Sequence, residues 1–268
     1  MPTHTTDKDW EHFGKLDPYW AVYTDERFRK SSLTEAALQE FFASGEAYVD
    51  FVFRTIRRHL DEEFSPAAVL DFGCGVGRLL VPFAKRCCSV VGIDVSDGML
   101  QEAKSQCASI RLTNVRLVKS DDYLSNVTEK FDLINSYIVL QHVSTERGEV
   151  IARSLIERLN DGGIGVLHFT YDKQHSNDPS GKPSVATESR LPSALRFGRS
   201  FAASVARLLR AHGRRPPEMQ MNSYDLNSIF AGLQNAGVRR IHVEFTNHDG
   251  CYGVLIFFKK ESHDQYLA

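Results

Sequence analysis

Three glycines at alternating positions form a turn between an apolar run and a helix-length segment, and this turn constrains the fold more than any other feature. The apolar run covers residues 68–71, the glycines are Gly73, Gly75 and Gly77, and the helix-length segment covers residues 79–86. Glycine lets the backbone bend sharply and approach a ligand that a Cβ atom would keep away. The order of strand, turn and helix gives the glycine pattern its meaning, because alternating glycines alone are weak evidence. The sequence therefore predicts an α/β unit with a ligand site at its turn.

The same alternation of short apolar runs and helix-length segments continues to about residue 170. The predicted strands, which are rich in Val and Ile, cover residues 68–71, 89–94, 115–118, 131–135 and 164–169. Helix-length segments lie between most of them, at 79–86, 98–109 and 146–160. Strands of this composition that alternate with helices pair in parallel through right-handed crossovers, with helices on both faces of the sheet.

The last part of the chain predicts a helix and a hairpin. The helix lies between residues 222 and 237, and strands at 240–245 and 253–259 are joined by a short connection at 247–250. Such a short connection indicates an antiparallel pair. The predicted fold class is therefore α/β, with a doubly wound, mostly parallel sheet of seven strands in which the last strand is antiparallel.

Two regions outside this pattern complete the predicted domain organisation. Residues 1–64 are rich in aromatic side chains and in helical spacing, and they predict a helical N-terminal cover on a main domain of residues 65–268. Residues 172–222 interrupt the alternation with Pro, Ser and Arg, and they predict an inserted lid. The aromatic side chains of the cover either exclude water from the site or fill a seam between helices, and the sequence supports both interpretations.

Acidic residues at the ends of three predicted strands distinguish the turn from a dinucleotide site. A dinucleotide fingerprint needs its third glycine one residue after Gly77, where this chain has Arg78. Asp71, just before the turn, would repel a diphosphate but attract an ammonium or sulfonium group. Asp94 ends the second strand, where a carboxylate can accept hydrogen bonds from ribose hydroxyls, and residues 121–122 follow the third. The pattern favours a positively charged nucleoside as ligand.

Four segments together resemble the class I S-adenosylmethionine-dependent methyltransferases of the small-molecule type. They are residues 70–78, 91–100, 131–134 and 140–143, and the resemblance spans residues 66–170, with the final strands added by topology. It implies the Rossmann-like methyltransferase fold of that family. It also implies S-adenosyl-L-methionine as cofactor and S-adenosyl-L-homocysteine as product.

The resemblance also implies a set of cofactor-binding residues, matched position by position. These are Asp71, Gly73, Cys74, Gly75, Gly77, Asp94, Val95, Met99, Asp121, Asp122 and Ser136. The glycines and Ser136 would line the methionyl part, with Asp71 near its ammonium group. Asp94 would hold the ribose hydroxyls. Val95 and Met99 would flank the adenine, whose edge would meet Asp121 and the backbone of Asp122.

The acceptor is expected to be a small molecule. The group expected to be methylated is a hydroxyl on a sugar, a natural product or a metabolite. A hydroxyl needs a base, for which His142 after the fourth strand is the candidate, with Tyr137 as a second catalytic candidate. A purely structural His142 is the alternative. Residues 135–138 lack the Asn-Pro-Pro-Tyr signature of amino-group methylation on bases, so no nucleic acid partner is expected. N- or C-methylation of a small molecule and a non-catalytic cofactor-binding module remain alternative functions.

The net charge and the cysteines limit the partners and the cellular compartment that we expect for the protein. The formal net charge is −2, which excludes binding to nucleic acid through net charge. Residues 190–215 carry seven Arg and no acid, which predicts either a solvated lid helix or a surface for an anionic acceptor or a membrane. No apolar run is long enough to span a bilayer. Five Cys without a Cys-x-x-Cys pair favour reduced thiols in a cytoplasmic protein with no metal site.

Overall fold

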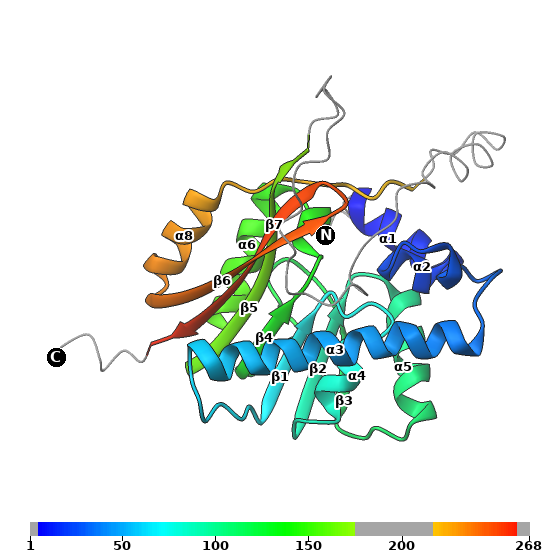
Figure 1. Cartoon of the computed structure of the whole chain (residues 1–268), viewed down its shortest axis with the longest axis horizontal. Coiled ribbons are helices and arrows are strands. Elements are labelled where there is room, and N and C mark those ends of the chain that lie inside the picture. Colours follow the sequence, from blue (N-terminus) through cyan, green and yellow to red (C-terminus); the bar gives the residue numbers. More distant parts are fainter. Residues whose placement is uncertain (1–4, 175–216, 262–268) are drawn as a thin grey trace.

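The computed structural model describes residues 5–174 and 217–261, and these residues contain a sheet of seven strands (Figure 1). The strands are β1 (Ala68–Phe72), β2 (Ser89–Asp94), β3 (Val115–Lys119), β4 (Phe131–Ser136), β5 (Leu159–Lys173), β6 (Val238–His248) and β7 (Cys251–Lys260). Their order is β3-β2-β1-β4-β5-β7-β6. Strands β1 to β5 pair in parallel, and β7 is antiparallel to both of its neighbours. The predicted fold class is confirmed.

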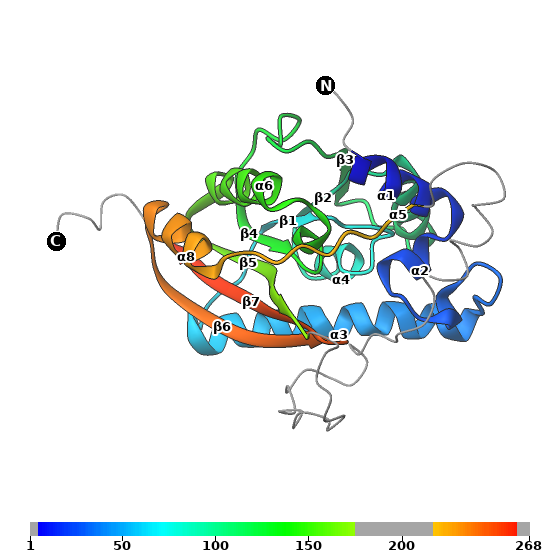
Figure 2. The same cartoon turned by 90° about the horizontal axis from the view of Figure 1, so that it is seen from above.

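Helices cover both faces of the sheet, as Figure 2 shows. On one face lie α3 (Glu35–His59), α4 (Leu80–Ala84) and α5 (Asp97–Ser109), and on the other lie α6 (Thr145–Glu157) and α8 (Leu226–Asn235). Alternate residues of one strand serve the two layers: Val69 belongs to the first core cluster and Leu70 to the second. This period of two explains why the inner strands are apolar throughout, because both of their faces are covered.

The predicted hairpin near the C-terminus forms with a very short connection. Strand β6 ends at His248 and β7 begins at Cys251, so that Asp249 and Gly250 alone make the turn. Both residues have positive φ values, 51° and 84°, as a tight two-residue hairpin turn requires. The turn brings residues of the last two strands back to the edge of the sheet where β1 to β4 end.

Apolar residues at three- and four-residue steps predict a helix over residues 46–60, and the structure shows that this helix, α3, already begins at Glu35. It begins after Thr34, whose Oγ1 accepts a hydrogen bond from the Ala37 amide at 3.2 Å, and it continues through Gly45 without a break. A Cβ atom at Gly45 would lie 2.1 Å from the carbonyl oxygen of Arg78. Gly45 therefore lies inside the helix at a close contact with Arg78, although a glycine in a sequence often indicates the end of a helix.

The N-terminal helices α1 (Thr5–Leu16) and α2 (Pro18–Val22) lie beside the start of α5 (Figures 1 and 2). Glu11 accepts a hydrogen bond from the Asp97 amide at 2.7 Å, and Tyr19 donates one to Glu102 at 2.5 Å. Their aromatic side chains form a cluster with Val76 and Met99 of the main domain. The division at residue 64/65 stays a prediction. Helix α3, which precedes it, shares its hydrophobic core with the sheet.

Residues 175–216 lie outside the described part of the chain, and with them lie most of the predicted insertion and the whole arginine-rich segment 190–215. The anionic acceptor and the membrane contact that this segment suggests therefore stay predictions. Within residues 5–174 and 217–261, none of the helices combines the length and the apolar character needed to cross a bilayer.

Candidate cofactor and acceptor site

A cavity of about 1120 Å³ lies at the carboxyl ends of β1 to β4, where the sheet meets α1 and α2. Its walls come from four strand ends, the N-terminal helices, the short η2 helix (Leu140–His142) and the start of α6. Ligand sites of open α/β sheets occur at this edge. Small-molecule sites have volumes of about 300–1,000 Å³, so this cavity has room for a nucleoside and a second reactant together.

The glycine turn forms one wall of the cavity. Gly73 and Gly75 have φ values of +73° and +52°, and their amides donate to Ile93 O at 2.7 Å and to Asp94 Oδ2 at 2.8 Å. A Cβ at Gly73 would lie 2.3 Å from Val139, and one at Gly75 would lie 2.7 Å from Val22. Both valines line the cavity, so the missing Cβ atoms let other parts of the chain close around it.

Two residues predicted to line the cofactor pocket do not reach the cavity. Gly77 has φ +91°, but its Cα faces Ala103 of α5, so its role is helix packing. Ser136 is fully buried and absent from the cavity wall. Side chains alternate along β4, so Ser136 points to the opposite face from Asn135, and Asn135 is the residue that faces Asp71. Cys74 does line the wall, and burial raises the pKa of its thiol well above the usual value.

Asp71 presents a free carboxylate oxygen at the end of β1. Its Oδ1 accepts a hydrogen bond from Asn135 Nδ2 at 2.9 Å, and Asn135 Oδ1 in turn accepts one from the Tyr48 hydroxyl at 3.0 Å. Oδ2 is buried and has no hydrogen-bond partner among the described residues. Burial raises the pKa of Asp71 to about 7, against the opposing effect of the Asn135 hydrogen bond. An unpaired oxygen of this kind suits a cationic ligand group.

Asp94 is held rigidly at the end of β2. Oδ2 accepts from the Gly75 amide at 2.8 Å, and Oδ1 accepts from the Ser96 amide at 2.9 Å. Burial raises the pKa of this carboxyl to about 6, while the backbone hydrogen bonds oppose the rise. A carboxylate has about four lone-pair sites, so capacity for a further donor remains. Val95 and Met99 line the cavity next to it.

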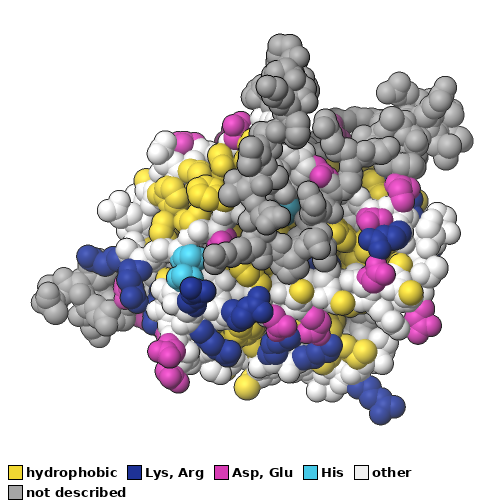
Figure 3. Space-filling model, viewed as in Figure 1, with side chains coloured by type: hydrophobic (Ala, Val, Ile, Leu, Met, Phe, Trp, Pro, Cys, Tyr) yellow, Lys and Arg dark blue, Asp and Glu magenta, His cyan; other side chains and the backbone are white. Residues whose placement is uncertain are grey.

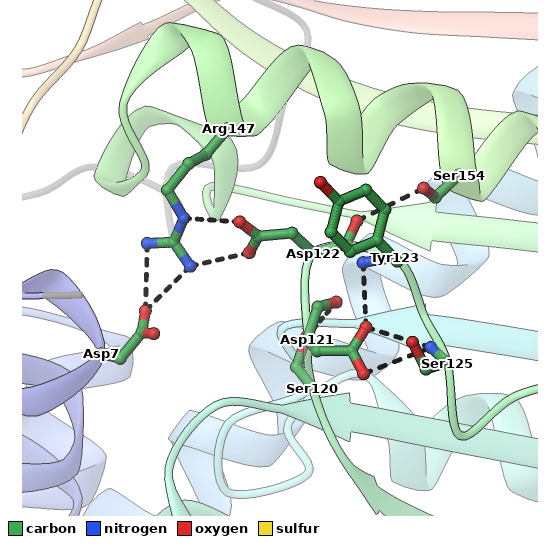
Figure 4. Close-up of polar contacts among 8 residues, drawn as sticks. All are labelled: Asp7, Ser120, Asp121, Asp122, Tyr123, Ser125, Arg147 and Ser154. Atoms are coloured by element: carbon green, nitrogen blue, oxygen red, sulfur yellow. Dashed lines mark hydrogen bonds and ion pairs between the residues drawn. The ribbon is translucent and has the colours of Figure 1, made fainter. Parts of the chain in front are cut away.

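Two acidic side chains of the loop after β3 form polar contacts, one within the loop and the other with Arg147, which also contacts helix α1 (Figure 4). Asp121 Oδ1 accepts from the amides of Tyr123 and Ser125 at 2.9 and 3.0 Å, so this carboxylate stabilises its own loop. Asp122 forms a two-point ion pair with Arg147 of α6, at 2.8 and 2.7 Å. Arg147 also donates to Asp7 of α1 at 3.1 Å. Both acids line the cavity as predicted, but Asp122 turns its carboxylate toward the Arg147 bridge.

His142 lies in the cavity wall against Trp10, with ring centroids 4.9 Å apart. Its Nδ1 is 2.7 Å from the carbonyl oxygen of Gln220. A carbonyl only accepts hydrogen bonds, so Nδ1 carries the proton and Nε2 keeps its lone pair. Gln141 places its side-chain nitrogen 3.4 Å from Nε2. Burial lowers the pKa of His142 to about 4, so the imidazole is neutral at physiological pH.

Tyr137 is buried in the cavity wall, with its ring 4.2 Å from that of Tyr48 and edge-on to His168 and His248. Its hydroxyl has no hydrogen-bond partner among the described residues. Burial raises the pKa of the phenol, which stays protonated. The Tyr137 hydroxyl is therefore available to donate a hydrogen bond to an oxygen or nitrogen atom of a ligand.

Several residues of the site escaped the sequence analysis. They come from elements far apart in the chain and include Asp7, Trp10, Val22, Arg78, Arg147, Met219, Met221 and His248. No motif marks them, except that Arg78 directly follows the glycine turn. Within the described ranges, no group of three or more His, Cys, Asp or Glu side chains is placed to hold a metal ion.

Comparisons with known proteins find similarity to methyltransferases in the central part of the chain. Residues 69–163 match the family model of a methyltransferase domain. A ubiquinone biosynthesis O-methyltransferase of Bartonella tribocorum is 35% identical over 81 residues, which cover 30% of this chain and 33% of that protein. The aklanonic acid methyltransferase DauC of a Streptomyces species (strain C5) is 34% identical over 121 residues, 41% of this chain and 55% of that protein. Residues 69–163 are therefore similar to a methyltransferase domain, and the relatives matched over this region are named as methyltransferases.

Solved methyltransferase structures share the fold across nearly the whole chain. The magnesium protoporphyrin IX methyltransferase of Synechocystis PCC 6803 with bound SAH has a TM-score of 0.59 and 17% identity, over 93% of this chain and 97% of that one. The N-methyltransferase NodS of Bradyrhizobium japonicum WM9 has a TM-score of 0.55 and 13% identity, over 97% and 100%. The curated relatives above are matched over only a third to about half of their length.

The residues present fit the cofactor of this methyltransferase family. The unpaired Oδ2 of Asp71 suits the ammonium group of S-adenosylmethionine, and the spare lone-pair capacity of Asp94 suits a ribose hydroxyl. The side chains of Val95 and Met99 supply an apolar surface for the adenine. These three features lie along one continuous wall, in the order of the strand ends.

Proposed function

We propose that this protein binds S-adenosylmethionine and transfers its methyl group to a hydroxyl of a small molecule, with His142 as the general base. The observation that carries the proposal is the state of His142: a neutral imidazole in the cavity wall whose Nδ1 donates to a backbone carbonyl and whose Nε2 is unprotonated. Such a ring can accept a proton without first losing one.

The cofactor end of the cavity binds and orients. The glycine turn and Asp71 take the methionyl part, Asp94 takes the ribose, and Val95 and Met99 flank the adenine. When bound, the cofactor supplies a methyl group on a positively charged sulfur. The protein's own contribution is to place the acceptor in line with that methyl group and to exclude water, since the reaction is a direct displacement.

At the acceptor end, His142 would take the hydroxyl proton. The hydroxyl proton would move to Nε2 as the acceptor oxygen takes the methyl group, whose bond to the cofactor sulfur would break at the same time. The products are a methyl ether and S-adenosylhomocysteine, and the imidazolium returns its proton to solvent after release. A base with a pKa near 4 is weak, but it is in the correct protonation state throughout the physiological range.

The lining of the acceptor end favours a hydroxyl on an apolar ring system over a sugar. Its walls include the aromatic side chain of Trp10 and the thioether side chains of Met219 and Met221. A sugar would leave most of its hydroxyls without partners there, whereas an aromatic or aliphatic ring would bury its surface favourably. The Tyr137 hydroxyl would donate to an oxygen of such an acceptor.

Calorimetry and a methyl-transfer assay test this proposal together. We expect S-adenosylhomocysteine to bind the purified protein, and we expect label from S-adenosylmethionine to reach phenolic or alicyclic hydroxyl compounds. A set of amines and activated carbon acids of matched size serves as the comparison. Transfer to the amines or carbon acids alone would replace O-methylation by N- or C-methylation, and binding without transfer to any of the three classes would favour a non-catalytic module.

A further inference from the structure

Arg78 is a buried cation in the cavity wall that the proposed reaction does not use. Its side chain is 6% exposed, and Nη1 donates to Ser44 Oγ at 3.3 Å. Nε is buried and has no hydrogen-bond partner among the described residues. The ion pairs between described residues do not include Arg78. A guanidinium has five N–H groups, so most of its hydrogen-bonding capacity is unused.

The backbone and the first part of the side chain of Arg78 pack tightly against helix α3. Gly45 of α3 lies directly against the Arg78 carbonyl, with no room for a Cβ atom, and against the Cγ of the same residue. The Ser44 hydroxyl donates to Phe41 O at 2.6 Å, so it offers Arg78 only a lone pair. A buried charge without a counter-ion is costly, and a bound anion would offset that cost.

The neighbours of Arg78 show which anion fits. Tyr23, Tyr48 and Tyr137 surround it electrostatically but are phenols whose pKa values burial raises, so they do not neutralise the guanidinium. The carboxyl group among these neighbours is Asp71, which interacts with Arg78 through space without forming an ion pair. One cavity wall therefore presents a carboxylate and a guanidinium, each with unused capacity.

This pair of opposite charges is complementary to an α-amino acid in its zwitterionic form. We propose that Arg78 binds the α-carboxylate of the methionyl group of the cofactor while Asp71 binds its ammonium group. The proposal rests on the proposed function and assigns the amino-acid end of the ligand to two side chains of this chain. Arg78 directly follows the glycine turn and interacts electrostatically with Asp71, the residue expected to bind the ammonium group.

The test measures the coupling between the guanidinium and the carboxylate by calorimetry. The two ligands are S-adenosylhomocysteine and its decarboxylated analogue, which keeps the amine, the thioether and the adenosine. In Arg78→Met we expect S-adenosylhomocysteine to bind about 10- to 100-fold more weakly, because charged hydrogen bonds of this strength are lost. The affinity of the decarboxylated analogue should change less than about threefold. Arg78→Lys keeps the charge but loses the planar fork of the guanidinium. Its affinity for S-adenosylhomocysteine should lie between those of the wild type and Arg78→Met.

Two controls separate this role from a structural one. Arg54→Met removes an exposed Arg on the same side of the fold and should leave both affinities unchanged. The melting temperature of ligand-free Arg78→Met should equal or exceed that of the wild type, because an apolar side chain replaces an uncompensated buried charge. If Arg78→Met does not fold, the ratio of the two affinities in Arg78→Lys carries the test.

Three results would overturn the assignment. Equal weakening of both ligands would show that Arg78 only supports the cavity wall. Unchanged binding of S-adenosylhomocysteine with a raised KM for the acceptor would show that the guanidinium binds an anionic acceptor instead. A lower melting temperature of ligand-free Arg78→Met, with no change in the affinity ratio, would show a structural partner. Failure of the wild type to bind S-adenosylhomocysteine would overturn the proposed function itself.

Discussion

The two ends of the cavity are assembled in different ways. The cofactor end takes Asp71, Gly75 and Asp94 from consecutive strand ends, so residues close in the sequence stand side by side in space. The acceptor end joins Trp10 from the N-terminus, His142 from the middle and residues 219–221 from beyond the insertion. A shared fold fixes the first arrangement, whereas the second depends on contacts particular to this chain.

The two ends also differ in how burial changes their titratable groups. At the cofactor end burial raises the pKa values of two carboxyls, Asp71 to about 7 and Asp94 to about 6. At the acceptor end burial lowers the pKa of His142 to about 4. Near neutral pH, proton uptake and release therefore accompany cofactor binding. In the free protein the proposed base stays neutral over this pH range. The pH dependence near neutrality should therefore distinguish variants that impair cofactor binding from variants that impair methyl transfer.

The largest expected effect follows removal of the base. His142→Ala should lower kcat by about 10²- to 10⁴-fold, the usual contribution of general base catalysis. The affinity for S-adenosylhomocysteine should stay within about twofold, because His142 lies at the acceptor end and the two sites are separate. Single-turnover rates and calorimetry give the two numbers. A kcat close to that of the wild type would assign His142 a structural role and leave the hydroxyl proton to another group.

The second effect should appear at the cofactor end and in stability. Gly75→Ala places a Cβ 2.7 Å from Val22 in a residue with φ +52°. We expect the free energy of unfolding to fall by about 1–3 kcal/mol and the cofactor affinity by about tenfold or more, since both strain and displacement of α2 act there. Gly232→Ala, in helix α8 with no atom within 4 Å of the new Cβ, is the matched control. It should stabilise the protein by up to about 1 kcal/mol. Equal effects of the two substitutions would contradict the role of the turn.

The sequence predicted the cofactor end better than the acceptor end, for a physical reason. The strand order and the acids at the strand ends follow from periodicity and topology, so Asp71 and Asp94 could be placed in advance. Ser136 was placed wrongly because a one-residue step along β4 reverses the direction of a side chain, and Asn135 holds the position instead. Arg147 could not be found, because its partners Asp7 and Asp122 are distant in sequence and surface ion pairs leave no pattern. The predicted helix over residues 46–60 begins eleven residues after the start of α3, and the structure shows that Gly45 lies inside this helix in close contact with Arg78.

A third, smaller effect concerns pH. Asp71 holds a proton below about pH 7 in the free protein, whereas binding of an ammonium group requires the carboxylate. The affinity for S-adenosylhomocysteine should therefore rise about fivefold from pH 6 to pH 7 and level off above about pH 8. Asp94, with a pKa of about 6, also contributes to such a rise. Methylthioadenosine keeps the ribose but lacks the ammonium group, so the difference between the two ligands isolates Asp71. Titration in two buffers of different ionisation enthalpy should show proton release at pH 6, and a smaller release in Asp71→Asn, where Asp94 alone contributes.

The smallest expected effect tests whether α1 contributes to the cofactor end through Arg147. Asp7→Asn removes the negative charge that joins α1 to Arg147 and leaves the two-point pair between Arg147 and Asp122 in place (Figure 4). Partly exposed ion pairs are worth about 1 kcal/mol or less, so cofactor affinity should fall only about two- to fivefold, and less at high salt. Glu129→Gln, which breaks the exposed pair with Arg116, changes net charge equally and should leave the affinity unchanged. A drop of the same size in both variants would mean that overall charge, and not the contact with α1, sets the effect. An unchanged affinity in Asp7→Asn would show that α1 stays closed through Glu11 and its hydrogen bond from the Asp97 amide.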